Sequence, residues 1–265
     1  MIAKNFVTEW RTRAPWPSDA QVEQDLIVTR AVVQIYQDPL LAAALAFRGG
    51  TALYKIHILP PARYSEDIDL VQTRPEPIGP TLDRLRAALD PWLGEPRRVL
   101  KPGRVQIVYR IISEAPERIP LRLKIEINSQ EHFSVEGYRR YPIDLASSWF
   151  SGRAEVQTFS REKLLGTKMR ALYQRNKGRD LFDLWKGLQS KEIVPAQIVK
   201  VFERYLEHEG RRVSRKTFEN NLNEKLREEA FRAEVVPLMA PGERWDVDVA
   251  AAVVRERLLA LLSAH

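Results

Sequence analysis

The sequence contains no cysteine and only four histidines in 265 residues. The absence of cysteine excludes disulfides, zinc ribbons, iron–sulfur clusters and thiol catalysis. The histidines are His57, His132, His208 and His265, and none lies near another in the sequence. Their separation argues against a histidine-rich metal site and against a Ser-His-Asp triad.

A long apolar run is also missing. The opening segment, MIAKNFVTEWRTRAPWP, carries charges throughout and has no apolar run of signal-peptide length. The most apolar stretch is the sixteen residues 247–262, and it is interrupted by Arg255, Glu256 and Arg257. Such a stretch cannot cross a membrane core. We therefore expect a C-terminal amphipathic helix, no membrane partner and a cytoplasmic location.

Apolar residues make up 44% of the chain and charged residues 29%, which is the balance of a globular protein with a proper core. Lysine and arginine number 42 against 35 acidic residues, and the net charge is +7. This charge suggests a polyanionic partner such as nucleic acid, nucleotide or anionic lipid, although a solvated basic surface explains it equally well. The excess is local, because residues 161–191 contain nine basic and three acidic residues.

The length allows one large domain or two modest ones. Apolar spacing predicts helices at 18–46, with a break at Asp38-Pro39, and at 51–58 and 81–93. Alternation with period two predicts strands at 67–71, 105–112 and 121–127. After about residue 160 only helices fit, at 160–175, 179–189, 195–208, 215–230 and 246–263. We therefore expect an α/β domain over residues 1–155 and a helical domain over residues 156–265.

The sharpest local feature is FRGGTALYK followed by SEDIDL, within residues 47–70. Gly49 and Gly50 precede a predicted helix, and such a turn either binds a phosphate through backbone N–H groups or is a plain turn. Asp67 and Asp69 share one face of a predicted strand, about 7 Å apart. Two like charges so placed repel unless a cation lies between them, and Mg²⁺ commonly binds one or two carboxylates plus substrate phosphates.

Glu126 lies on the polar face of the predicted strand LRLKIEIN. A neighbouring strand could place its carboxylate beside Asp67 and Asp69 as a third metal ligand. A surface residue paired with Lys124 or Arg122 is an equally good interpretation.

A second group of charged residues lies in EKLLGTKMRALYQRNKGRDLFDL, residues 162–184. Lys168 and Arg175 are seven residues apart, which predicts one helical face, and Asp180 and Asp183 are predicted to share a face of the next helix. A lysine and an arginine beside a cleft can hold a triphosphate. Ion pairs on a solvated helix are the alternative.

Together these motifs closely resemble the AbiEii/AbiGii family of nucleotidyltransferase toxins, which belongs to the DNA polymerase β-like superfamily and occurs in bacterial toxin–antitoxin and phage-defence modules. The motifs occur in the family's order within residues 47–184. The resemblance implies a polymerase β-like domain with a mixed sheet, followed by a helical domain that carries the Lys/Arg/Asp motif. The sixteen residues between Gly50 and Asp67 exceed the usual gap of the superfamily, and this family accommodates the longer gap.

The resemblance also implies roles for individual residues. Gly49 and Gly50 would form the phosphate-binding turn, and Asp67 and Asp69 would bind the metal, with Glu126 as a third ligand. The downstream catalytic or nucleotide-binding positions would be Lys168 and Asp180, supported by Arg175, Arg179 and Asp183. We also assign Ser65 to nucleotide binding. In some family members the equivalent serine is a phosphorylation site through which an antitoxin silences the toxin.

The expected activity is a metal-dependent transfer of a nucleoside monophosphate from an NTP, with Mg²⁺ or Mn²⁺ as cofactor. Relatives add nucleotides to tRNA 3′ ends, so we expect tRNA or another RNA as acceptor and a cognate antitoxin as partner. The enzymatic alternative is transfer to a protein side chain. The non-enzymatic alternative is a nucleic-acid-binding protein on the same scaffold.

Overall fold

The computed structural model describes residues 2–113 and 118–263. Its contacts divide the chain into two compact units, Met1–Phe159 and Ser160–His265. The first unit mixes helices and strands, and the second is helical throughout its described residues. The predicted class, an α/β domain followed by a helical domain, is confirmed by this organisation.

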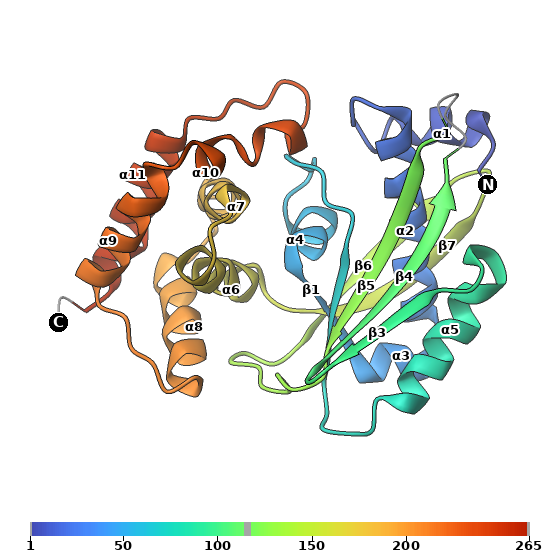
Figure 1. The fold of residues 1–265 in the computed structure, drawn as a ribbon, viewed down its shortest axis with the longest axis horizontal. Helices are drawn as coiled ribbons and strands as arrows, with labels where there is room; N and C mark the ends of the chain where they lie inside the picture. Colours follow the sequence, from blue (N-terminus) through green and yellow to red (C-terminus); the bar gives the residue numbers. More distant parts are fainter. Residues whose placement is uncertain (1, 114–117, 264–265) are drawn as a thin grey trace. The chain divides into compact units, whose positions relative to one another are not determined.

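The first unit is built on a five-stranded mixed sheet with the strand order β1-β2-β5-β4-β3 (Figure 1). Strands β2 and β5 are parallel, and the other three pairings are antiparallel. The bounds of the strands are β1 Leu45–Arg48, β2 Ile68–Gln72, β3 Arg97–Lys101, β4 Arg104–Ile112 and β5 Pro120–Asn128. A separate antiparallel hairpin consists of β6 Arg139–Ala146 and β7 Ser151–Thr158.

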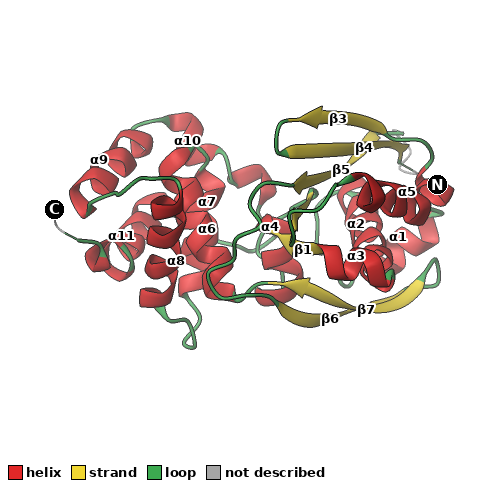
Figure 2. Ribbon diagram, turned by 90° about the horizontal axis from the view of Figure 1, so that it is seen from below, coloured by secondary structure: helices red, strands yellow, loops and turns green. Residues whose placement is uncertain are grey.

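Helices α2 and α5 pack on one face of this sheet. Helix α2 contacts both β5 and the β6–β7 hairpin, and Figure 2 shows it between the two. The capping box of Ser18 and Gln21 starts α2, as a serine followed three residues later by glutamine favours. The helical segments are α1 Lys4–Trp10, α2 Asp19–Gln37, α3 Pro39–Ala44, α4 Gly49–Ala52, the π-helical turn η1 Leu53–His57 and α5 Gly79–Leu93.

The side chains of strand β5 show which face of the sheet the helices cover. Its alternation is the predicted one, with Leu123, Ile125 and Ile127 fully buried against the helices. Lys124 and Glu126 point to the opposite face, which we call the open face, and both are half-buried. In β4 the alternation has the same period, with Ile107 and its odd-numbered neighbours buried.

The second unit contains helices at nearly all the predicted positions. Gly166 and Gly187 allow close packing here, because a Cβ on either would collide with Val201 or Leu165. The bounds are α6 Arg161–Gln174, α7 Gly178–Leu188, α8 Pro195–His208, α9 Arg215–Leu226, α10 Glu229–Ala233, η2 Val236–Leu238, α11 Val247–Arg257 and η3 Leu259–Leu261. No helix in the described part of the chain is long and apolar enough to span a membrane.

Candidate active site

The centre of the candidate site is a row of polar side chains across the open face. Asp69 on β2 is the direct cross-strand partner of Glu126 on β5. The row continues on one side to Arg48 on β1 and on the other to Gln106 on β4. The Gln106 amide donates a hydrogen bond of 2.8 Å to the Glu126 carboxylate. The structure therefore brings the two carboxylates side by side, on the face opposite helices α2 and α5.

Asp67 lies immediately before β2, and its carboxylate also faces this row. The Lys124 ammonium is 2.7 Å from Asp67 Oδ2 and 4.0 Å from Glu126 Oε2. Arg104 approaches the other oxygen of Glu126 at 3.3 Å. Two cationic side chains therefore lie where repulsion among three carboxylates would otherwise be uncompensated.

The surroundings of the Asp69 carboxylate disfavour its ionised form. Its burial raises the pKa, and the nearby charges of Asp67 and Glu126 raise it further, while Arg48 and Lys124 oppose the shift. The net result is a pKa above the ordinary aspartate value. A divalent cation beside Asp69 would stabilise the ionised carboxylate. It would therefore oppose the rise in pKa that burial and the neighbouring carboxylates cause.

The glycine turn is packed directly against these carboxylates. Gly49 begins α4 at a φ of 80°, and a Cβ at this position would collide with the Asp69 carboxylate. A Cβ on Gly50 would lie 2.5 Å from the Arg63 guanidinium and 3.1 Å from the Ser65 hydroxyl. The first turn of α4 therefore approaches the strand and the preceding loop more closely than any residue with a side chain could.

Thr51 ties this turn to the loop that carries Ser65. Its hydroxyl donates to the Asp67 carbonyl at 2.5 Å and lies 2.8 Å from the Ser65 hydroxyl. Thr51 is buried and Ser65 is half-buried. These two hydrogen bonds fix the backbone just before the Asp67 and Asp69 strand.

The donor set suits a hard divalent cation in part. Asp67 and Asp69 offer oxygen ligands of the type that Mg²⁺ and Mn²⁺ bind. Within residues 2–113 and 118–263, however, no group of three or more histidine, aspartate or glutamate side chains is close enough to hold a metal. In this arrangement Glu126 is bonded to Gln106 and Arg104. The two aspartates are thus the better candidates for ligands, and substrate phosphates would have to complete the set.

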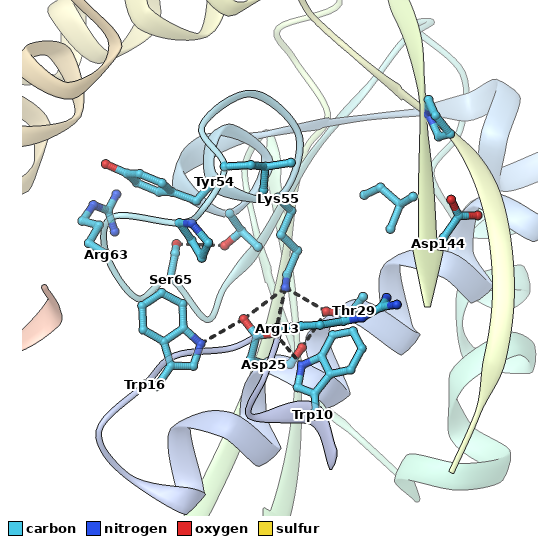
Figure 3. A pocket seen from close by; sticks show the side chains of 15 residues that line it. Trp10, Arg13, Trp16, Asp25, Thr29, Tyr54, Lys55, Arg63, Ser65 and Asp144 are labelled. Atoms are coloured by element: carbon cyan, nitrogen blue, oxygen red, sulfur yellow. Dashed lines mark hydrogen bonds and ion pairs between the residues drawn. The ribbon is translucent and has the colours of Figure 1, made fainter. Parts of the chain in front are cut away.

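Behind the glycine turn lies a cavity of about 350 Å³, lined by residues of α1, α2, η1 and β6 (Figure 3). At its base the Asp25 carboxylate accepts hydrogen bonds from the indole N–H groups of Trp10 and Trp16, at 2.9 and 3.1 Å. The Lys55 ammonium, from η1, bonds both Asp25 oxygens at 3.1–3.2 Å and the Thr29 hydroxyl at 2.7 Å. This network anchors the segment that follows the glycine turn to α2.

The second unit contains the other predicted constellation. The Lys168 ammonium lies 3.0 Å from Asp180 Oδ1 and 2.8 Å from Asp183 Oδ2, and both aspartates are fully buried. Arg175 makes a two-pronged contact with Asp180, at 2.7 and 2.8 Å. Burial alone would raise the pKa of Asp180, but Lys168 and Arg175 outweigh it and hold that pKa below its usual value. Asp180 is therefore ionised at neutral pH although it is buried.

The expectation that Lys168 and Arg175 share one helical face is wrong. Helix α6 ends at Gln174, and Arg175 follows it with an extended backbone at φ −135° and ψ 160°. That conformation turns the guanidinium towards the start of α7, where Asp180 lies. Arg179 pairs with Glu234 at 3.2 Å.

Most of the basic segment 161–191 is neutralised within the second unit. Six of its nine basic residues form ion pairs with carboxylates, namely Arg161, Lys168, Arg170, Arg175, Arg179 and Lys186. Lys163 is buried and lies over the Tyr205 ring. The local excess of positive charge in the sequence is therefore not an equally large positive surface.

Sequence reasoning missed several residues of the site. Arg48 and Thr51 lie in the glycine motif itself, and their proximity to Asp69 and Asp67 could have been suspected from that position. Lys124 was considered only as a surface partner of Glu126, whereas its closest carboxylate is Asp67. Arg104 and Gln106 reach Glu126 only through the β4–β5 register, which no local signal indicates.

Comparison with known proteins places this geometry in a family. Residues 30–253 match the family described as Nucleotidyl transferase AbiEii toxin, Type IV TA system. The chain resembles MenT4, a nucleotidyltransferase toxin from Mycobacterium tuberculosis, with a TM-score of 0.66 and 15% identity over 98% of this chain and 90% of that one. It also resembles a Helicobacter pylori protein assigned as a nucleotidyltransferase, with a TM-score of 0.57 and 17% identity over 92% and 95% of the two chains. No curated protein matches the sequence significantly.

The similarity to the two solved structures, at such low identity, concerns the fold. The family match carries the assignment, because it covers most of the chain and includes the glycine turn, the aspartate strand and the Lys168–Asp180 cluster. The protein therefore belongs to the AbiEii nucleotidyl transferase toxin family of type IV toxin–antitoxin systems, and it is a nucleotidyltransferase.

Proposed function

We propose that this chain transfers a nucleoside monophosphate from an NTP to a hydroxyl group of RNA, with the tRNA 3′ end as the acceptor. The observation that carries the proposal is the contact between the Gly49 turn and Asp69, with Asp67 beside it. This contact sets backbone N–H groups that suit a phosphate next to carboxylates that suit a divalent cation.

In the proposed reaction the acceptor oxygen attacks the α-phosphorus, and the bond from that phosphorus to the β-phosphate oxygen breaks. Pyrophosphate leaves, and the proton of the attacking hydroxyl is released. A divalent cation, Mg²⁺ or Mn²⁺, would supply charge neutralisation at the phosphates and activation of the hydroxyl. Asp67 and Asp69 would hold that cation, and Glu126 would support it from β5.

The remaining residues have positioning roles in this proposal. Gly49, Gly50 and Ser65 would contact the phosphates from the glycine turn and the adjacent loop. Two of the three N–H groups of Lys168 are directed at Asp180 and Asp183, and the third would donate to the triphosphate. Arg175 and Arg179 would add positive charge near the same cluster.

The family also supports a partner. A type IV toxin–antitoxin system implies a cognate antitoxin, and we propose that this chain has one. Phosphorylation of Ser65 as a silencing step stays a prediction. Its half-buried hydroxyl, bonded to Thr51, would have to leave that contact to be modified. The cytoplasmic location is likewise a prediction.

A labelling assay tests the proposal. Purified protein, Asp67→Ala and the control Asp83→Ala, an exposed aspartate on α5, are incubated with total tRNA, Mg²⁺ and each α-labelled NTP in turn. We expect label in RNA with the wild type and the control, and at least a hundredfold less with Asp67→Ala.

Other outcomes would replace the proposal. Label in protein would indicate a side-chain acceptor. RNA binding by all three proteins without any label would indicate a binding protein on this scaffold. Full activity of Asp67→Ala would contradict the assignment of the metal ligands.

A further inference from the structure

The open face of the sheet carries a set of arginine and lysine side chains beside the carboxylate row. On β3 and β4, Lys101 and Arg104 are direct cross-strand partners, and on β4 and β5, Arg110 is opposite Arg122. Arg97 on β3 continues the row that contains Lys124. The register thus places cations on both sides of the Asp69–Glu126 row.

The Arg110–Arg122 pair is unusual because its two like charges face each other. Directly opposed residues of an antiparallel pair have Cβ atoms about 4.5–5.5 Å apart, so like charges there are destabilising. Both side chains are exposed, and neither forms an ion pair with a carboxylate of the described residues. The same holds for Arg97 and Lys101. An anionic ligand would remove this repulsion.

The position of these cations matches a chain of phosphates that leads to the site. Arg122 precedes Glu126 by four residues of one strand, about 13 Å, and the Lys101–Arg104 row lies about 7 Å beyond Glu126 on the other side. The face therefore offers positive charge over about 20 Å, with the carboxylates between its ends. The basic segment 161–191 offers much less, because most of its cations are already paired.

We propose that this set of cations, Arg97, Lys101, Arg110 and Arg122, binds the phosphate backbone of the acceptor RNA. The proposal rests on the proposed function, which requires an acceptor hydroxyl at the carboxylate row. The uncharged residues on this face of β3, β4 and β5 are Val99, Gln106, Val108, Ile112, Pro120 and Asn128, with no aromatic side chain among them. Protein interfaces favour aromatic residues and exclude charge from their centre, whereas nucleic-acid interfaces are strongly positive. Without aromatic platforms the contacts are to phosphates and do not depend on base sequence.

The test compares Arg110→Gln/Arg122→Gln with Arg139→Gln/Arg140→Gln, which removes two exposed arginines from β6 in the same unit. Binding of labelled tRNA is measured without NTP at several salt concentrations. Loss of two phosphate contacts should lower the log–log salt slope by about 1.4–1.8 and weaken binding about tenfold. The control should keep the wild-type slope. Because repulsion is removed, the test variant should be at least as resistant to urea as the wild type.

Three results of the binding measurement would overturn the inference. These are an unchanged slope in the test variant, an equal loss in the control, or polyglutamate competing as well as RNA of the same charge. The binding measurement does not require transfer, so a failure of the proposed activity leaves it readable. If transfer is observed, the test variant should raise KM for tRNA and leave kcat and the KM for a dinucleotide acceptor unchanged. An altered kcat with an unchanged KM would also contradict the inference.

Discussion

Gly49 meets two separate constraints, a backbone constraint and a steric one. Its φ of 80° lies in the left-handed region, and any Cβ would overlap the Asp69 carboxylate. Gly94 has nearly the same φ, 79°, but nothing lies within 4 Å of its potential Cβ. Alanine substitutions at the two positions therefore distinguish the effect of backbone strain from the effect of displacing the Asp69 carboxylate.

We predict that Gly49→Ala lowers nucleotidyl transfer about a hundredfold, since a displacement near 1 Å in a catalytic site has effects of that size. Both variants should lose ~1–2 kcal/mol of unfolding free energy, because alanine is strained at a positive φ. Gly94→Ala should nevertheless keep its activity. Steady-state kinetics and urea unfolding on both variants check this. Equal activity in the two variants would show that the Gly49–Asp69 contact is unimportant.

The sequence predicted on which strand faces the candidate site residues lie better than it predicted their partners. Asp69 and Glu126 could be placed on polar faces of strands from alternation alone, because alternation is a local property. That Glu126 lies beside Asp69 depends on the β2–β5 register, and the position of Arg175 depends on where α6 ends. Neither is encoded within one segment, so both required the assembled structure.

At the scale of elements, the ion pair of Asp25 and Lys55 joins α2 to η1. Both side chains are largely buried, at 9% and 14% exposure. Removing one partner of a buried pair leaves an uncompensated charge, at a cost of about 3–5 kcal/mol. We predict this loss for Lys55→Met in urea unfolding, and a smaller loss for Asp25→Asn/Lys55→Met. A loss below 1 kcal/mol in Lys55→Met would contradict the anchoring role of the pair.

Lys225 of α9 stabilises the end of α6 through hydrogen bonds to the carbonyls of Leu172 and Tyr173, the latter at 2.9 Å. Burial lowers the pKa of Lys225 to about 8 from 10.5. The unfolded chain therefore binds more protons between these two values, and this group makes stability rise as pH increases from 8 to 10.5.

We predict that the unfolding free energy of the wild type rises relative to that of Lys225→Met as the pH increases from 8 to 10.5. Below pH 7 the difference between the two should be constant. The control is Lys216→Met, an exposed lysine of the same helix, which should show no such pH dependence. Urea unfolding at pH 7, 8.5 and 10 measures it. A parallel pH response in the two variants would contradict the lowered pKa.

The elements that the sequence did not predict share a physical cause. Strand β1 continues an apolar run directly from α3, so only the change of backbone at Leu45 marks it. Strand β3 is largely exposed and shows no alternation, and β6 contains Pro142, which argues against a strand. These strands are specified by their partners across the sheet. The helices of the second unit, in contrast, have apolar faces with their own period and were predicted to within a few residues.

For the molecule as a whole, metal binding should be visible as added stability. If Asp67 and Asp69 bind Mg²⁺, a concentration 100 times Kd adds about 2.7 kcal/mol to the unfolding free energy. We predict that saturating Mg²⁺ raises Tm by about 5–10 °C in the wild type and in the control Asp83→Asn, an exposed aspartate on α5. Asp69→Asn should show no rise, and an equal rise there would place the metal elsewhere.

The six tryptophans of this chain form three pairs in three different places. Trp10 and Trp16 share the Asp25 carboxylate, Trp92 and Trp149 enclose the Arg30 guanidinium, and Trp185 and Trp245 pack on Phe182 in the second unit. Indole emission depends on neighbouring charges and hydrogen bonds, so each pair is an intrinsic optical reporter of its surroundings. Replacing two pairs with phenylalanine would leave fluorescence from the third alone, and the Trp10–Trp16 signal would follow events at the glycine turn without any attached dye.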